Sequence, residues 1–156
     1  MLLALIVVPT ATAAFSVSLT TVSPVTAPGV TLTGVDQTAT FTISITVSDA
    51  PSGNGLGWNV SAAATTPTSG ANTLPPLQVT TVAAGACSGG SCVNATNAIA
   101  WPVTLTAGGV KIYNAAVGTG TRTTVLTPTV KISYPSNAIA GTYSSTLTVT
   151  GINNGP

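Results

Sequence analysis

The sequence contains no histidine and no glutamate, and only 3% of its 156 residues are charged. Its only acids are Asp36 and Asp49. The histidine-based triads and glutamate-containing carboxylate pairs of many hydrolases are therefore excluded. Both aspartates are expected beside strand ends, where aspartate is an ordinary turn residue, although the two could in principle pair. We predict that the protein is not an enzyme and holds no cofactor or metal ion.

Positive charge is equally scarce, because the only cations are Lys111, Arg122 and Lys131. Three cations cannot form the dense basic face that phosphate backbones require, so nucleic acid is excluded as a partner. Disordered chains combine low hydrophobicity with high net charge. This chain is 44% hydrophobic with a net charge of +1, so we expect an ordered protein.

Cysteine occurs only twice, at Cys87 and Cys92, which bracket the small-residue stretch "CSGGSC". Two thiolates without histidine or acidic neighbours cannot complete a tetrahedral zinc site. The spacing also differs from the C-x-x-C pattern of redox motifs. We therefore predict a local disulfide between Cys87 and Cys92, a bond typical of exported proteins.

Long apolar runs are missing except at the start, where "MLLALIVVPTATAAF" joins an apolar stretch to small residues. The apolar part, residues 2–8, is too short to cross a bilayer as a helix, so no stable membrane span is expected. Residues 11–13 fit an A-x-A cleavage signal. We predict a signal peptide over residues 1–14, a secreted or cell-surface location, and one domain over residues 15–156. The alternative is that the first segment forms a strand of the mature protein.

Threonine, serine and valine are abundant instead, and threonine and valine are typical of strands. In "QTATFTISITV", residues 37–47, apolar and hydroxyl-bearing residues alternate strictly, which predicts a half-buried strand with a hydroxyl-coated outer face. Residues 142–150, "TYSSTLTVT", repeat this pattern. Further strands are expected over residues 16–22, 30–33, 58–65, 77–83, 99–106, 111–117, 123–126 and 130–134. Short strands separated by turn signals indicate an all-β protein, an antiparallel β-sandwich of Ig-like or Greek-key type with about 8–9 strands.

The two tryptophans are candidates either for binding or for packing. Trp58 could stack on sugar rings or fill the space between two sheets. If Trp58 points inward, the strand period also points Val60 inward and Asn59 outward, which favours packing. Trp101 precedes a proline and fits an edge strand or the base of an exposed loop. Tyr143 is more typical of a core residue with a solvated hydroxyl.

Two segments, "SDAPSGNGLGWNVSA" and "AGTYSSTLTVTGINNGP", together resemble the WxL family of bacterial cell-surface proteins. That family has a Trp-x-Leu element after a glycine-containing turn, and a second motif that runs from a tyrosine on a threonine-rich strand to another Trp-x-Leu. Here the first element is Trp58-Asn59-Val60, with valine in place of leucine. The second begins at Tyr143, with Val149-Thr150-Gly151 where Trp-x-Leu would stand. The resemblance implies an exported domain held non-covalently on the cell wall by peptidoglycan.

Two functions follow as hypotheses. The first is a secreted, non-catalytic module that binds cell-wall glycan or other surface proteins, with threonine, serine and asparagine side chains supplying weak hydrogen bonds. Its candidate glycan contacts, if they are not core residues, are Trp58, Asn59, Val60, Trp101 and Tyr143. The alternative is a structural subunit that self-assembles into a surface filament or layer by β-strand addition. Uncharged, threonine-rich strands lack the lysines that discourage edge pairing, which motivates this alternative.

Overall fold

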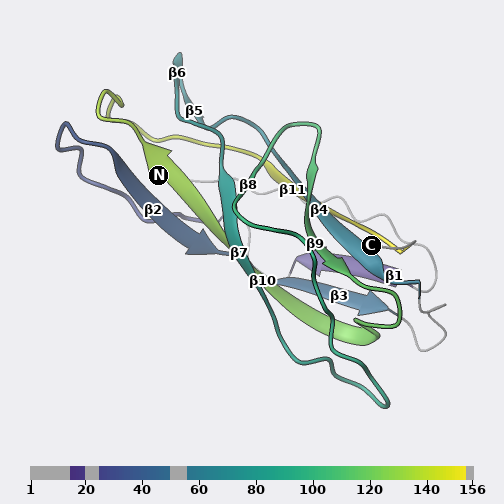
Figure 1. Cartoon of the computed structure of the whole chain (residues 1–156). Coiled ribbons are helices and arrows are strands. Elements are labelled where there is room, and N and C mark those ends of the chain that lie inside the picture. Colours follow the sequence, from purple (N-terminus) through teal and green to yellow (C-terminus); the bar gives the residue numbers. More distant parts are fainter. Residues whose placement is uncertain (1–14, 20–24, 50–55, 154–156) are drawn as a thin grey trace.

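The computed structural model describes residues 15–19, 25–49 and 56–153 of the chain, all in strands, turns and loops. The expected signal peptide, residues 1–14, lies outside these residues, as do residues 20–24, 50–55 and 154–156. The strands of the described residues are β1 (Phe15–Leu19), β2 (Gln37–Thr42), β3 (Ile45–Asp49), β4 (Trp58–Ala64), β5 (Thr68–Ser69), β6 (Asn72–Thr73), β7 (Gln78–Ala84), β8 (Val103–Thr104), β9 (Val110–Ala115), β10 (Arg122–Tyr134) and β11 (Leu147–Ile152) (Figure 1).

The large sheet has the order β1-β3-β10-β7-β8, and β2 also pairs with β10. Every pairing in it is antiparallel. β2 and β3 follow one register along β10, from Tyr134 opposite Gln37 to Arg122 opposite Asp49. They are separate strands because Pro128 of β10 lies opposite their junction and has no N–H to donate. The carbonyl of Pro128 still accepts a hydrogen bond from the N–H of Ile43, at 3.2 Å.

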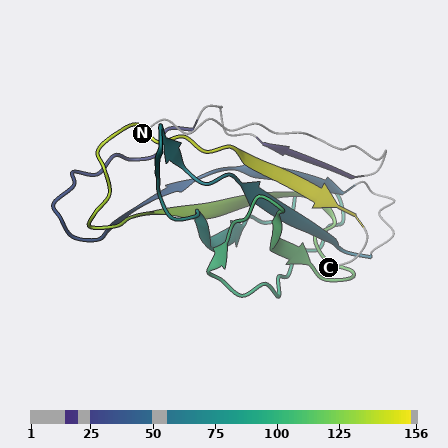
Figure 2. The same cartoon turned by 90° about the horizontal axis from the view of Figure 1, so that it is seen from above.

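The small sheet has the order β11-β4-β9, and a two-residue hairpin, β5-β6, stands apart from both sheets. β11 and β4 lie side by side over the large sheet (Figure 2). β1 packs against β11 at Gly151, where an added Cβ would collide with Val17 and lie 2.8 Å from a ring carbon of Phe15. A glycine at this position therefore lets the two sheets approach closely at their β1 and β11 edges.

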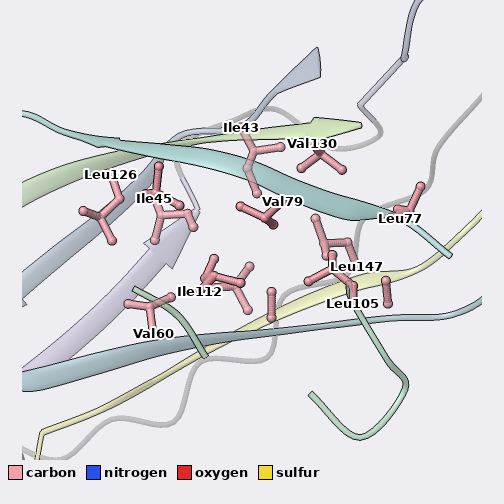
Figure 3. Packing of buried hydrophobic residues seen from close by; sticks show 14 of the residues in the cluster. Ile43, Ile45, Val60, Leu77, Val79, Leu105, Ile112, Leu126, Val130 and Leu147 are labelled. Atoms are coloured by element: carbon pink, nitrogen blue, oxygen red, sulfur yellow. The ribbon is translucent and has the colours of Figure 1, made fainter. Parts of the chain in front are cut away.

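The core fills the space between the two sheets. Side chains along a strand point alternately to its two faces, so the apolar side chains of each strand gather on the face that points to the other sheet. Along β2 and β3 the burial of side chains alternates with the period of two predicted from the sequence. In Figure 3, large-sheet side chains such as Ile43, Ile45 and Val130 face Val60 and Ile112 of the small sheet. The prediction of an all-β protein built from antiparallel sheets packed as a sandwich is therefore confirmed.

The described residues form eleven strands, more than the eight or nine expected, for local reasons. Three of the strands, β5, β6 and β8, have only two residues, and the break opposite Pro128 divides one predicted strand into two. Other strand predictions were wrong in detail. Residues 30–33 form a loop instead of a strand, and the strand expected over residues 99–106 is reduced to Val103–Thr104. The separate strands expected on either side of Pro128 are one 13-residue strand, β10.

Candidate functional site

The structure places Trp58 in the core. Its side chain is fully buried, and its indole Nε1–H donates a hydrogen bond of 2.8 Å to the carbonyl of Gly120. The indole stacks on Tyr113 at 5.6 Å between ring centroids, and the tilted ring of Phe15 lies 6.4 Å from it. Because its side chain is fully buried, Trp58 cannot serve as an open platform for a sugar ring.

The neighbours of Trp58 in the Trp-x-Leu-like element are buried as well. Val60 is fully buried in the core. Asn59 lies on the other face of β4, as its position in the strand predicts, yet it is only 5% exposed instead of open to solvent. Beside it, Asn114 of β9 is bonded to the segment before Trp101: its Oδ1 accepts from the N–H of Ala98 at 2.9 Å. This element is structural at every position.

Trp101 is half-buried at the end of the segment that follows the disulfide. Its Nε1–H donates to the carbonyl of Ile112 in β9 at 3.0 Å, and Tyr113 donates from its hydroxyl to the carbonyl of Ala95 at 3.3 Å. These bonds, with those of Asn114, tie residues 94–101 along the outer edge of β9. Trp101 is thus an anchor for this segment.

The predicted disulfide between Cys87 and Cys92 is confirmed, with an S–S distance of 2.05 Å. The N–H of Cys87 donates to Oδ1 of Asn94 at 2.9 Å, and Ser88 forms a β-bridge to Thr123 near the start of β10. The disulfide therefore pins a loop at the end of the sandwich where β10 begins.

Tyr143 lies at the opposite end of the sandwich, where β10 ends at Tyr134. We call this the Tyr134 end; Figure 1 shows it at the upper left, where the loops before β2 and after β10 meet. A groove of about 410 Å³ is formed there by residues 29–32, residues 139–141, Tyr134 and Tyr143. We call it the tyrosine groove.

The tyrosine groove is uncharged and mostly apolar. None of the residues that line it in the described structure carries a charge. Its rim includes Ile139, a large hydrophobic side chain that is 57% exposed. The hydroxyl of Tyr143 donates to the carbonyl of Ile139 at 2.7 Å and so fixes this wall. Burial raises the pKa of the Tyr134 phenol, which stays a neutral hydroxyl at physiological pH.

A second hollow, of about 340 Å³, lies beside the tyrosine groove and shares Tyr134 with it. Its other lining residues include Asp36, Thr38 and Ser133. Oδ1 of Asp36 accepts a hydrogen bond of 2.7 Å from the N–H of Ser136, which fixes the chain just after β10. We call this the polar hollow. The Tyr134 end thus offers two adjoining concavities built from loops, and binding residues commonly lie on such loops.

Asp49 does not lie at the Tyr134 end of the sandwich. Asp49 ends β3, whereas Asp36 precedes β2, and the thirteen residue-to-residue steps of mostly extended chain from one to the other span roughly 43 Å. The two carboxylates therefore cannot act as a pair. In the described part of the chain, no cluster of three or more histidine, cysteine, aspartate or glutamate residues could hold a metal ion.

Burial also gives Asp49 a pH-dependent effect on stability. Its residue is 5% exposed, and desolvation raises the pKa of its carboxyl group above the ordinary value. A raised folded-state pKa stabilises the fold below the unfolded-state pKa, and this contribution is lost as pH rises through the folded-state pKa. We expect Asp49→Asn to be more stable than the wild type at pH 7 and to lose this advantage near pH 3. Urea unfolding midpoints at both pH values measure the difference; an equal difference at both would contradict the assignment.

No known family matches the chain. It also matches no curated protein and no solved structure. The resemblance to the WxL family therefore stays a prediction. Among the described residues, no helix is long and apolar enough to cross a membrane. Any functional conclusion has to come from the geometry of the site itself.

Of the predicted site residues, Tyr143 lines a concave surface that the described residues form, the tyrosine groove. Trp58 begins β4, whereas Tyr143 lies beyond the other end of this strand, near Ala64. The end of the second family-like motif does pair with the first, because Gly151 of β11 lies opposite Val60 of β4. Residues 29–32 and Ile139 were not predicted from the sequence, because their partners lie about a hundred residues away along the chain. Residues 30–33 alternate apolar and hydroxyl-bearing residues, so the sequence predicted a strand there instead of a loop that lines a groove.

Proposed function

We propose that the protein is an exported, non-catalytic surface protein that binds neutral cell-wall glycan in the tyrosine groove. One observation carries the proposal: the groove of about 410 Å³ is uncharged and lined by two tyrosines. Sites for small ligands commonly have about 300–1,000 Å³, an apolar lining and a few polar groups. A sugar residue matches this lining, because its ring has an apolar face and its edge carries hydroxyls. Thr31 and the backbone of the two loops supply polar partners.

Export is supported by the disulfide between Cys87 and Cys92, because such bonds persist in oxidising compartments. It also agrees with the apolar N-terminal segment and with the WxL resemblance of the sequence. Binding without catalysis is supported by the separation of Asp36 from Asp49, which leaves the tyrosine groove without an acid among its described lining residues. A pocket of this kind can hold a neutral ligand, and the raised pKa of the Tyr134 phenol keeps that lining hydroxyl neutral.

The test is a pull-down with purified cell wall, comparing the wild type with Ile139→Asp and Val117→Asp. Ile139 is 57% exposed on the groove rim, and Val117 is 64% exposed at the other end of the sandwich, so both substitutions place the same charge on an exposed apolar site. We expect Ile139→Asp to weaken wall binding about tenfold or more, equivalent to about 1.4 kcal/mol. Val117→Asp should bind as the wild type does. Full recovery of the wild type in the supernatant would contradict the proposal.

The alternative, self-assembly by β-strand addition, is favoured by a different observation. Among the described strands, β1 and β11 lie at sheet edges, and their sequences, FSVSL and LTVTGI, contain neither lysine nor proline to discourage pairing with another copy. The pull-down separates the two functions if one arm omits the wall. Sedimentation of the protein in that arm would support assembly, whereas sedimentation only with wall present supports glycan binding.

A further inference from the structure

The outer face of the large sheet carries a regular array of hydroxyl groups. On β10 the side chains at odd-numbered positions point away from the core, and the register places each opposite an outward residue of β2 or β3. We call these twelve residues the hydroxyl ladder. They are Thr123, Val125, Thr127, Thr129, Lys131 and Ser133 on the β10 side, and Ser48, Thr46, Ser44, Thr42, Thr40 and Thr38 on the other.

Ten of the twelve ladder residues are threonine or serine, and none of the twelve is buried. Neighbouring strands widen the array: Ser16 and Ser18 of β1 lie opposite Ser48 and Thr46, and Thr81 of β7 lies opposite Thr129. Side chains on one face repeat about every 6.7 Å along a strand, and adjacent strands lie about 4.8 Å apart. Each hydroxyl can both donate and accept a hydrogen bond. The face is therefore a lattice of equivalent, weak hydrogen-bonding groups.

The near-absence of charge on the hydroxyl ladder indicates which kind of polymer it can bind. It contains no acid, and Lys131 is its only charged residue. A densely charged polymer would find too few counter-charges here. A neutral, hydroxyl-rich partner can form hydrogen bonds with such hydroxyls in exchange for bonds to water, so the burial of these groups carries little net cost. Neutral polysaccharide has this chemistry.

The ladder is also continuous with the concave end of the molecule. Its last rung, Thr38 opposite Ser133, lines the polar hollow beside Tyr134. From Thr123 to Ser133 the ladder is roughly 33 Å long, at 3.3 Å per residue. Only an extended chain could contact both the hollow and the far rungs.

We propose that an extended neutral polysaccharide chain lies along the hydroxyl ladder, with one end of the contact in the polar hollow. This inference rests on the proposed function and adds to it the binding face and the form of the ligand. The ligand is a polymer held by many weak contacts along the strands, and the tyrosine groove contacts only one part of it.

The experiment measures binding of a graded series of N-acetylglucosamine oligomers, which carry the hydroxyl and amide groups of a wall glycan without its charged peptides. The variant is Thr42→Glu, which places a charge at an exposed mid-ladder position, and Thr40→Glu serves as a second such variant. The matched control is Thr148→Glu, an outward position on β11 of the small sheet. Thermal unfolding of each variant verifies that it folds.

We expect affinity of the wild type to rise with oligomer length, and Thr42→Glu to lower affinity for the longest oligomers about tenfold while leaving the shortest unaffected. Thr148→Glu should behave as the wild type. Affinity that does not depend on length, or Thr42→Glu and Thr40→Glu that both bind long oligomers as the wild type does, would overturn the inference. If the wild type binds purified wall and only Ile139→Asp weakens that binding, the ladder fails and the groove stands. If the wild type binds no wall, the proposed function itself fails.

Discussion

Replacing Trp58 by alanine should lower the free energy of unfolding by about 3–5 kcal/mol. The side chain is fully buried and contacts the rings of Tyr113 and Phe15, and a buried tryptophan removes up to about 250 Å² from water. The substitution leaves a cavity that the two sheets cannot close, because β4 is held between β9 and β11. It also leaves the buried carbonyl of Gly120 without its indole donor. Denaturant unfolding followed by far-ultraviolet circular dichroism measures the loss.

Trp101→Ala is the matched control, because Trp101 makes the same kind of hydrogen bond, from Nε1–H to a strand carbonyl, but is only half-buried. We expect a loss of about 1–2 kcal/mol for this variant. Trp58→Phe separates the two contributions at Trp58, since it keeps an aromatic ring and removes the donor, at a cost of about 1–3 kcal/mol. A Trp58→Ala variant no less stable than Trp101→Ala would show that Trp58 does not hold the core together.

Local periodicity was sufficient to predict the layers of this fold. The alternation in residues 37–47 predicted which side chains of β2 and β3 enter the core, because strand geometry alone sets a period of two. The same period predicted that Val60 follows Trp58 inward. The spacing and chemistry of Cys87 and Cys92 predicted their bond, since so short a segment between two otherwise unpartnered thiols leaves few alternatives.

The tyrosine groove could not be predicted in the same way. It depends on residues 29–32 meeting residues 139–141, and nothing in either segment specifies the other. The continuity of β10 through Pro128 was missed for a related reason. Proline normally argues against a central strand, but here its missing N–H faces the junction of β2 and β3, and its carbonyl still accepts a hydrogen bond from the N–H of Ile43. The burial of Asn59 likewise could not be predicted from the alternation along β4, because it depends on segments that are distant in sequence and lie next to β4 in the fold.

Gly57→Ala, directly before the Trp-x-Leu-like element, should be strongly destabilising, with an expected loss of roughly 2–5 kcal/mol in the free energy of unfolding. Gly57 has a φ of +79°, a conformation that alanine adopts only at a cost. An added Cβ would also collide with the backbone carbonyl oxygen of Ala115 and lie 3.1 Å from the carbonyl carbon of Ala116. These are main-chain atoms of β9 and the turn after it, so no rotamer change can relieve the contact.

Gly118→Ala measures the conformational cost alone, so the difference between the two variants gives the steric part of the effect at Gly57. Gly118 has nearly the same φ, +77°, but no atom lies within 4 Å of the position that an added Cβ would take, so only the conformational cost of about 1–2 kcal/mol remains. Equal losses for the two variants, measured by denaturant unfolding, would show that β4 does not press against β9 at this point. A larger loss at Gly57 explains why glycine directly precedes tryptophan in this chain. Only glycine lets β4 begin close enough to Ala115 for the indole of Trp58 to enter the core, and Gly120 on the facing turn leaves room for it, since a Cβ there would lie 2.6 Å from the indole nitrogen.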